Sequence, residues 1–138
     1  MNELFLDASF VIALAVPADQ HHAKASDLKE KIRLSNTHLI TTLAVALEIG
    51  NALSGRKYRD AAASLLDALD HDPDIEVVAV DQGLYERGLE FYRSRSDKEW
   101  GLTDCISFVV MHERGLTDAL TTDRHFQQAG FRALLRDN

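Results

Sequence analysis

The chain has 138 residues and a mass of 15.4 kDa, the size of one compact domain, so we expect residues 1–138 to form a single domain. Hydrophobic residues make up 46% and charged residues 27%, which excludes a disordered or low-complexity protein. The net charge is −7, from 22 acidic and 15 basic residues, which excludes a protein that holds nucleic acid by its overall charge.

The first half of the chain alternates between short apolar runs and helical patterns. Leu4–Leu6 is long enough only for a buried strand. Ser9 can then cap a helix over Phe10–Leu14, which Pro17 ends because proline cannot continue a helix. The next elements expected are a helix with an apolar stripe of Ala25, Leu28 and Ile32, a strand at 38–41, a helix at 43–53 that begins after Thr42, an amphipathic helix around 59–69 and a turn at 72–74.

The second half continues this alternation. The β-branched run Ile75–Val80 predicts a strand, and Asp81 can cap the helix that follows it. Residues 94–101 are the most polar and least periodic part and predict a surface loop. Thr103 is expected to begin a buried helix that ends at Gly115. The last elements expected are a strand at 119–121, a helix at 124–129 and a strand at 131–135. Strands that alternate with helices predict a parallel α/β sheet.

No segment of the sequence predicts secretion or a membrane span. The apolar run from Phe10 to Val16 follows acidic residues rather than basic ones and is far shorter than a bilayer requires. Cys105 is the only cysteine, so an internal disulfide and a multi-cysteine metal site are both excluded. We therefore expect a cytoplasmic protein with no membrane association.

Two aspartates are expected at one edge of the predicted sheet. Asp7 follows the first strand, and Asp123 follows the strand at 119–121. The carboxyl ends of parallel strands share an edge, and ligands bind there in open α/β sheets. The two carboxylates should therefore face one cleft. The alternative for each is a helix cap, because aspartate is common at strand-to-helix junctions.

Glu48 is the only charge between Leu43 and Ser54. A helix that is apolar almost all round is expected to be buried, and an unpaired buried carboxylate is too costly to keep. No cation lies three or four residues away, so its partner must come from elsewhere; the alternative is a buried salt bridge. Asp104 repeats the pattern at the start of an apolar run, where Thr103 already offers a cap.

Carboxylates that converge need a positive charge among them. Two carboxylates about 4 Å apart repel by roughly 4 kcal/mol at an effective dielectric near 20. No Lys or Arg is close in sequence to Asp7 or Glu48, and oxygen ligands suit Mg²⁺ or Mn²⁺ rather than zinc. Such an ion orients water and offsets the charge of phosphoryl oxygens, so that an acidic cleft accepts phosphate.

Four segments of the sequence resemble the PIN domain family, and within it the VapC-type toxin ribonucleases. They are Leu6–Ser9, Glu48–Asn51, Leu102–Phe108 and Leu120–Phe126. Each motif is short, but the ordered set spans nearly the whole chain. The resemblance implies a three-layer α/β/α sandwich with a central parallel sheet of about five strands. It also implies an endoribonuclease that cleaves RNA with Mg²⁺ or Mn²⁺, and a homodimer that a small antitoxin protein holds inactive.

The resemblance also assigns roles to single residues. It implies that Asp7 and Asp104 are direct metal ligands. Glu48 and Asp123 would be further acids that act through water or a second metal. Ser9 and Asn51 would be supporting polar residues.

Basic and aromatic residues near these acids are candidates for RNA contact. Arg56–Arg59, Arg93–Lys98 and Arg124–His125 adjoin the proposed metal residues, although charged surface loops explain them equally well. Trp100 is interpreted as a partly buried anchor rather than a base-stacking platform. No histidines pair at the spacing of a helical zinc site, and Cys105 is interpreted as a small buried hydrophobe.

Two other functions are weighed against the nuclease. Leu6-Asp7 also resembles the nucleophile strand of a dehalogenase-type phosphatase, but no second Asp follows two residues later, and there is little room for a cap domain. A non-catalytic module could instead use the cleft only to bind a partner. Trapping a phosphorylated Asp7 would favour the first alternative, and failure to bind a metal would favour the second.

Overall fold

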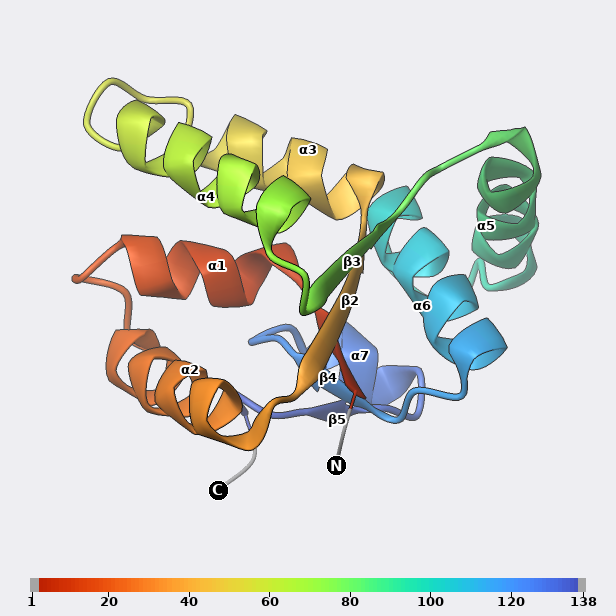
Figure 1. Ribbon diagram of the computed structural model, residues 1–138. Helices are drawn as coiled ribbons and strands as arrows, with labels where there is room; N and C mark the ends of the chain where they lie inside the picture. The colour runs from red at the N-terminus through yellow and green to blue at the C-terminus, as the bar shows by residue number, and fades with distance from the viewer. Residues whose placement is uncertain (1–2, 137–138) are drawn as a thin grey trace.

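The computed structural model describes residues 3–136 and is built around a central five-stranded sheet (Figure 1). The strands lie side by side in the order β3-β2-β1-β4-β5, and every pairing is parallel. This confirms the predicted α/β class and the parallel sheet. The strands are β1 (Glu3–Leu6), β2 (His38–Thr42), β3 (Ile75–Val78), β4 (Asp118–Leu120) and β5 (Arg132–Ala133).

Helices cover both faces of the sheet. In Figure 1, α1, α2 and α4 lie to one side of the strands, and α5 and α6 lie to the other. Among the described residues, no helix is both long and apolar enough to cross a membrane. The helices are α1 (Ala8–Ala15), α2 (His22–Ser35), α3 (Leu43–Ala52), α4 (Arg59–His71), α5 (Gln82–Ser94), α6 (Leu102–Arg114) and α7 (Arg124–Gln128).

Side-chain caps explain where several helices begin. Thr42 and Asp81 accept hydrogen bonds from backbone N–H groups in the first turns of α3 and α5, at 3.2 and 2.8 Å, as predicted. The prediction for α1 is wrong, because the helix already begins at Ala8 and Ser9 lies inside its first turn. The Ser9 hydroxyl donates a hydrogen bond to Asp7 instead of capping the helix.

The two edge strands are shorter than the sequence predicts. β3 ends at Val78 rather than Val80, and β5 covers only two of the five residues at 131–135. Each edge strand pairs with a neighbour on one side only, so its ends lack the second ladder of hydrogen bonds that holds an inner strand. The inner strands β1, β2 and β4 therefore form the rigid centre of the sheet.

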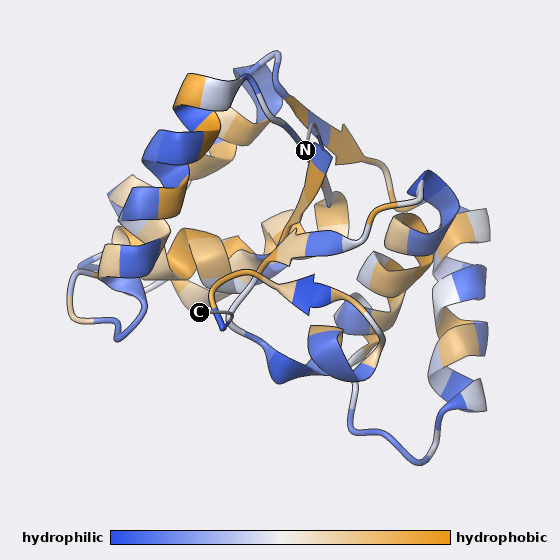
Figure 2. Cartoon of the chain, turned by 90° about the horizontal axis from the view of Figure 1, so that it is seen from below, coloured by the Kyte–Doolittle hydropathy of each residue, from blue (hydrophilic) through white to orange (hydrophobic). Residues whose placement is uncertain are grey.

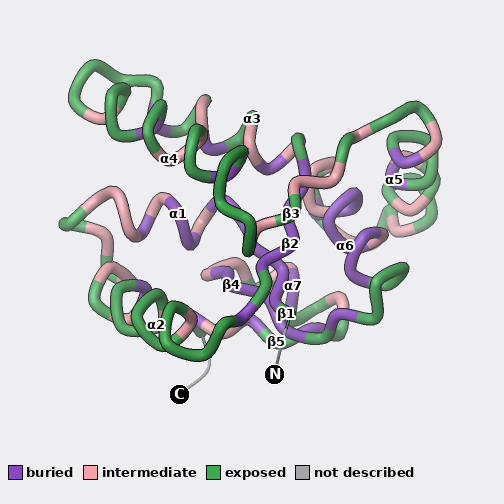
Figure 3. Tube along the Cα trace, viewed as in Figure 1, coloured by how far each residue is buried: buried purple, intermediate pink, exposed green. Residues whose placement is uncertain are grey.

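Aromatic side chains fix the helices of one face to the inner strands. Phe5, Phe108 and Phe126 are fully buried, and the Phe126 ring centroid lies 4.9 Å from that of Phe108 and 6.1 Å from that of Phe5. Figure 3 shows β1, β2 and the middle of α6 as buried, and Figure 2 shows the central strands as mostly hydrophobic. This packing holds the starts of α6 and α7 beside the carboxyl end of β1.

Candidate metal centre

Asp7 and Asp123 lie at the same edge of the sheet, as predicted. Asp7 directly follows β1, and Asp123 follows β4, the strand that pairs with β1. The backbone N–H of Asp7 donates to the carbonyl of Leu120 at 3.2 Å, which ties the end of one strand to the end of the other. Strand order thus brings together two acids from opposite ends of the sequence.

Two hydroxyl groups hold the buried carboxylate of Asp7, which is 5% exposed. Its Oδ2 accepts hydrogen bonds from Thr121 at 2.7 Å and from Ser9 at 2.9 Å. The Ser9 hydroxyl in turn accepts from the backbone N–H of Thr122 at 2.9 Å. Asp7 occupies the cap position of α1 but its side chain makes no cap hydrogen bond, so the capping alternative does not explain this residue.

Asp104 does take part in starting its helix. Its Oδ2 accepts a hydrogen bond from the backbone N–H of Gly101 at 3.2 Å, and α6 begins at Leu102. The expectation that Thr103 caps this helix is wrong. Thr103 already lies in the first turn, so the carboxylate one residue further on satisfies the free N–H group ahead of the helix.

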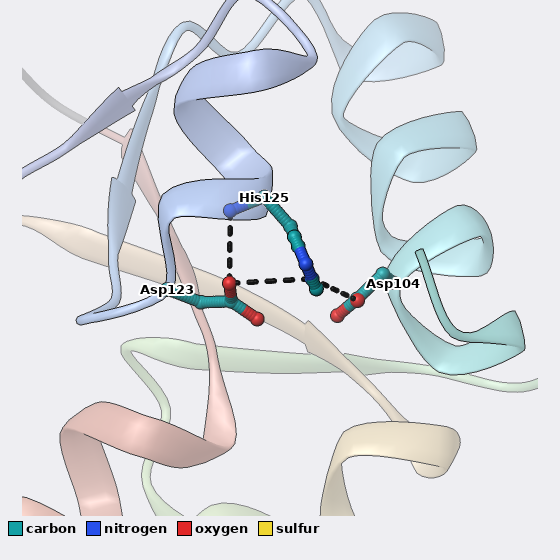
Figure 4. A group of neighbouring side chains, drawn as sticks. All are labelled: Asp104, Asp123 and His125. Carbon is teal, nitrogen blue, oxygen red and sulfur yellow. Dashed lines mark hydrogen bonds and ion pairs between the residues drawn. The ribbon is translucent and has the colours of Figure 1, made fainter. Parts of the chain in front are cut away.

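Asp123 combines both of the roles considered for it. Its Oδ1 accepts a hydrogen bond from the backbone N–H of His125 at 2.8 Å and so caps α7. The same oxygen lies 3.3 Å from Nδ1 of the His125 ring, and this Nδ1 lies 3.2 Å from Oδ2 of Asp104 (Figure 4). The ring therefore stands between the carboxylates of α6 and α7.

The sequence interpretation noted His125 only as a basic neighbour of Asp123. In the described part of the chain, Asp104, Asp123 and His125 form the group of possible ligands whose donor atoms lie within 4.8 Å of one another. A search of the sequence for paired histidines cannot find this group, because the group contains only one histidine and one of its aspartates, Asp104, comes from a different helix. One feature of the sequence could have indicated this role. His125 lies two residues after Asp123, in the first turn of the predicted helix, and this position places its side chain near the sheet edge that carries Asp123.

Glu48 is exposed, so the prediction of a helix buried all round is wrong. α3 buries only the face that carries Val45 and Ile49, and Leu47 on the other face is 69% exposed. The reason is that α3 packs against α1, α4 and α6 and no further layer covers its outer side. The apolar composition of a helix shows how hydrophobic it is, but it does not show how many other elements pack against the helix and bury it.

Glu48 nevertheless lies within the electrostatic reach of the other three acids. Its pKa is raised to about 7 by desolvation of the carboxylate and by the negative charges of Asp7, Asp104 and Asp123. Among residues 3–136, no Lys or Arg forms an ion pair with Glu48, so the salt-bridge alternative is not supported. The charges of three predicted acids from three other segments therefore reach Glu48, although the group of possible ligands found in the described residues includes only Asp104 and Asp123 of the four acids.

The pKa values of Asp7 and Asp104 are also raised. Burial raises the pKa of Asp7, and hydrogen bonds from Thr121 and Ser9 partly oppose this. Burial and the charge of Asp123 raise the pKa of Asp104, against the lowering effect of Gly101 and His125. The cluster is thus short of positive charge. Its four carboxylates are hard oxygen donors, the donor set that Mg²⁺ and Mn²⁺ use.

The remaining predictions near the site have mixed outcomes. Trp100 is 4% exposed and its Nε1 donates to Oε1 of Gln128 at 3.0 Å, which confirms the anchor role. Cys105 is buried as expected, and burial raises its pKa to about 11. Asn51 is exposed on α3, and within residues 3–136 no hydrogen bond joins its side chain to the four acids.

Comparison with known proteins decides the family. The model of the PIN domain matches residues 4–132 of the chain. The chain belongs to the PIN domain family. This confirms the resemblance of the four sequence segments, and the four acids lie in the part of the chain that matches.

Relatives of this PIN domain include VapC20 of Mycobacterium tuberculosis, named a 23S rRNA-specific endonuclease. The two are 29% identical over 131 residues, which cover 93% of this chain and 95% of the relative. The crystal structure of VapC20, described as a Sarcin-Ricin loop cleaving toxin, matches with a TM-score of 0.80 at 27% identity over the same shares of the two chains.

Two more distant structures share the fold of this PIN domain. DNA-bound VapBC from Salmonella typhimurium matches with a TM-score of 0.67 at 14% identity, covering 96% of this chain and 97% of the other. VapBC2 from Rickettsia felis, bound to a promoter DNA fragment, matches with a TM-score of 0.64 at 13% identity, covering 95% and 96%. At these identities the likeness concerns the fold alone.

Proposed function

We propose that this PIN domain is a metal-dependent endoribonuclease and the toxin of a type II toxin–antitoxin pair. One observation carries the proposal. Asp7, Glu48, Asp104 and Asp123 come from four separate segments, yet the charges of Asp7, Asp104 and Asp123 raise the pKa of Glu48, and no Lys or Arg of the described residues forms an ion pair with any of the four. Such a cluster is costly unless a cation binds to it.

The chain's own residues prepare the site for that ion. We assign Asp7 and Asp104 as its direct ligands, and Glu48 and Asp123 as acids that complete the site. When bound, a divalent ion supplies positive charge that offsets the charge on the phosphoryl oxygens of RNA during displacement. The hydroxyls that bond to Asp7, described above, fix its carboxylate, so little reorganisation is needed when a ligand binds.

The substrate class follows from the relatives. VapC20, which is similar over nearly its full length, is named for cleavage of 23S rRNA. We therefore propose RNA as the substrate and ribosomal RNA as the first one to test. From the resemblance to VapC-type toxins, we also propose a small antitoxin as the inhibitory partner and a homodimer as the assembly.

The decisive experiment measures RNA cleavage by purified protein in Mn²⁺, in Mg²⁺ and in EDTA. We expect cleavage with either ion, none in EDTA, and at least about a 100-fold loss in the Asp7→Asn and Asp104→Asn variants. The matched control is Asp70→Asn, which alters an exposed acid on α4 outside the cluster and should cleave at the wild-type rate. Cleavage by folded Asp7→Asn or Asp104→Asn at that rate would refute the assignment.

A further inference from the structure

His125 is a basic side chain that lies against two acids of the four-acid site and has no role in it so far. Its Nδ1 lies between two carboxylate oxygens, 3.2 Å from Oδ2 of Asp104 and 3.3 Å from Oδ1 of Asp123. We propose that this nitrogen is a ligand of the divalent ion, and that it makes the site prefer Mn²⁺ over Mg²⁺. The inference rests on the proposed function, because it concerns the same metal site.

The spacing of the three donor atoms fits a shared ion. In octahedral coordination with bonds of about 2.1 Å, neighbouring donors lie about 3.0 Å apart. The two observed distances exceed this by only a few tenths of an ångström. Small side-chain rotations would therefore let Nδ1 and both oxygens bind one ion without moving α6 or α7.

The two carboxylates are already anchored by their own helices. Asp104 accepts from Gly101 N–H at the start of α6, and Asp123 accepts from His125 N–H at the start of α7. Phe126, the next residue in α7, is fully buried against Phe108. The backbone of His125 is therefore held in place, and its ring is directed at a preformed pair of oxygens.

The three side chains are also accessible to an ion from solvent. The side chains of Asp104, Asp123 and His125 are 16%, 32% and 24% exposed. An ion can thus lose part of its water shell as it binds, instead of having to enter a closed cavity. The arrangement suits an exchangeable ion that is loaded after the chain has folded.

Nitrogen in the ligand set separates the candidate ions by their chemistry. Mg²⁺ prefers oxygen donors and gives up its waters reluctantly. Mn²⁺ belongs to the first-row transition series, whose divalent ions bind sites that mix nitrogen and oxygen ligands. A ligand set of carboxylates plus one imidazole therefore adds affinity for Mn²⁺ that it does not add for Mg²⁺.

A purely positioning role makes a different prediction. If His125 only orients the two carboxylates by hydrogen bonds, its loss would weaken Mn²⁺ and Mg²⁺ binding by the same factor. If its nitrogen binds the ion, the loss falls on Mn²⁺. The experiment must therefore observe the metal–nitrogen contact directly and compare the two ions.

The test uses Mn²⁺ as a paramagnetic probe of tag-free protein. Electron spin-echo envelope modulation of the bound Mn²⁺ should show coupling to a coordinated ¹⁴N nucleus in the wild type and in the His71→Gln control. His71 is exposed at the end of α4. The coupling should be absent in folded His125→Gln. Calorimetric titration should show Mn²⁺ binding about 10- to 100-fold weaker in this variant, with Mg²⁺ binding changed by less than about 3-fold.

The outcomes separate this inference from the proposed function. Wild-type protein that binds Mn²⁺ and cleaves RNA without ¹⁴N coupling, or a His125→Gln variant that loses affinity for both ions equally, overturns the nitrogen ligand and leaves the nuclease intact. Wild-type protein that binds neither ion and cleaves no RNA overturns both proposals.

Discussion

Asp7 illustrates how the site depends on single hydrogen bonds. Its buried carboxylate is held by the hydroxyls of Ser9 and Thr121, one from α1 and one from the end of β4. When a buried carboxylate loses a hydrogen-bond donor, the free-energy cost of removing it from water remains, but the hydrogen bond that offset this cost is gone. The hydroxyls of Ser9 and Thr121 thus hold the carboxylate of Asp7 in place.

The Thr121→Val variant tests this dependence. The Thr121 hydroxyl donates to Asp7 and accepts from the backbone N–H of Asp123 at 3.0 Å. We expect a loss of about 1–3 kcal/mol in unfolding free energy, measured by urea denaturation, and weaker binding of Mn²⁺. The control is Ser64→Ala, which removes an exposed hydroxyl on α4 and for which we expect a change within about 0.5 kcal/mol. Equal stability of the two variants would argue against the network.

Glu48 gives the site a dependence on pH. Its pKa is raised from the ordinary 4.5 to about 7, so the folded chain binds this proton more tightly than the unfolded chain does. The metal-free protein must therefore lose stability as the pH rises from about 4.5 to about 7. Glu48→Gln removes this charge, so in EDTA at pH 8 it should melt at a higher temperature than the wild type.

The difference in melting temperature should shrink as the pH is lowered to 5, where Glu48 is protonated in the folded protein. Glu90→Gln, which changes an exposed acid on α5, serves as the control and should show no such trend. A Glu48→Gln variant that melts below the wild type in EDTA at pH 8 would contradict the assigned charge repulsion.

At the residue level the sequence predicts that the four acids gather at one site, but it does not reveal all of their surroundings. Asp7 and Asp123 could be placed because strand ends share an edge whatever their distance in sequence. His125 was missed because its contact with Asp104 depends on how two helices pack, which one sequence does not reveal. The burial of Glu48 was overestimated for a related reason: composition does not show that the outer face of α3 is left uncovered.

The helix pair α5 and α6 shows how closely whole elements can approach. Gly88 in α5 is buried against α6, and a Cβ placed on it would lie 2.5 Å from Cγ1 of Ile106. The α-carbon of Ile106 would be 3.4 Å away, so the backbone itself limits any adjustment. Glycine at this position allows the two helices to pack without a gap.

Substitution of glycine by alanine should have opposite effects in two helices. Gly88→Ala should lower the unfolding free energy by about 1–3 kcal/mol, because the methyl group forces α5 away from α6. Gly50→Ala in α3 meets only Leu66 at 3.6 Å, an ordinary contact, and should raise it by about 0.5–1 kcal/mol through helix propensity. Chemical denaturation measures both, and a stabilised Gly88→Ala would disprove the close packing.

The boundaries of helices and strands were predicted best where they depend only on nearby residues. Thr42 and Asp81 are predicted caps that the structure confirms, because a cap depends only on its own first turn. The lengths of β3 and β5 were overestimated, because apolar β-branched residues predict extended chain and not the presence of a second partner strand. The start of α6 was misplaced because Asp104 competes with Thr103 for the same role.

At the scale of the whole molecule, metal binding should be coupled to folding. An ion that binds only the folded chain stabilises it by about 2.7 kcal/mol at a concentration 100 times its Kd. We expect Mn²⁺ to raise the melting temperature of the wild type, and to do so more at pH 8 than at pH 6, because protons compete for carboxylates whose pKa values are raised. Asp7→Asn should abolish the shift. A shift that persists in this variant would place the ion elsewhere.

The strand order has a consequence for synthesis of the protein. β1 is translated first, but its partner β4 follows more than a hundred residues later, and the Ser9 and Thr121 hydroxyls that meet across this junction are separated by 112 positions. A nascent polypeptide therefore cannot assemble the acidic cluster until residue 123 has left the ribosome. The acidic cluster is thus a late product of synthesis, completed only after strand β4 and Asp123 have been made.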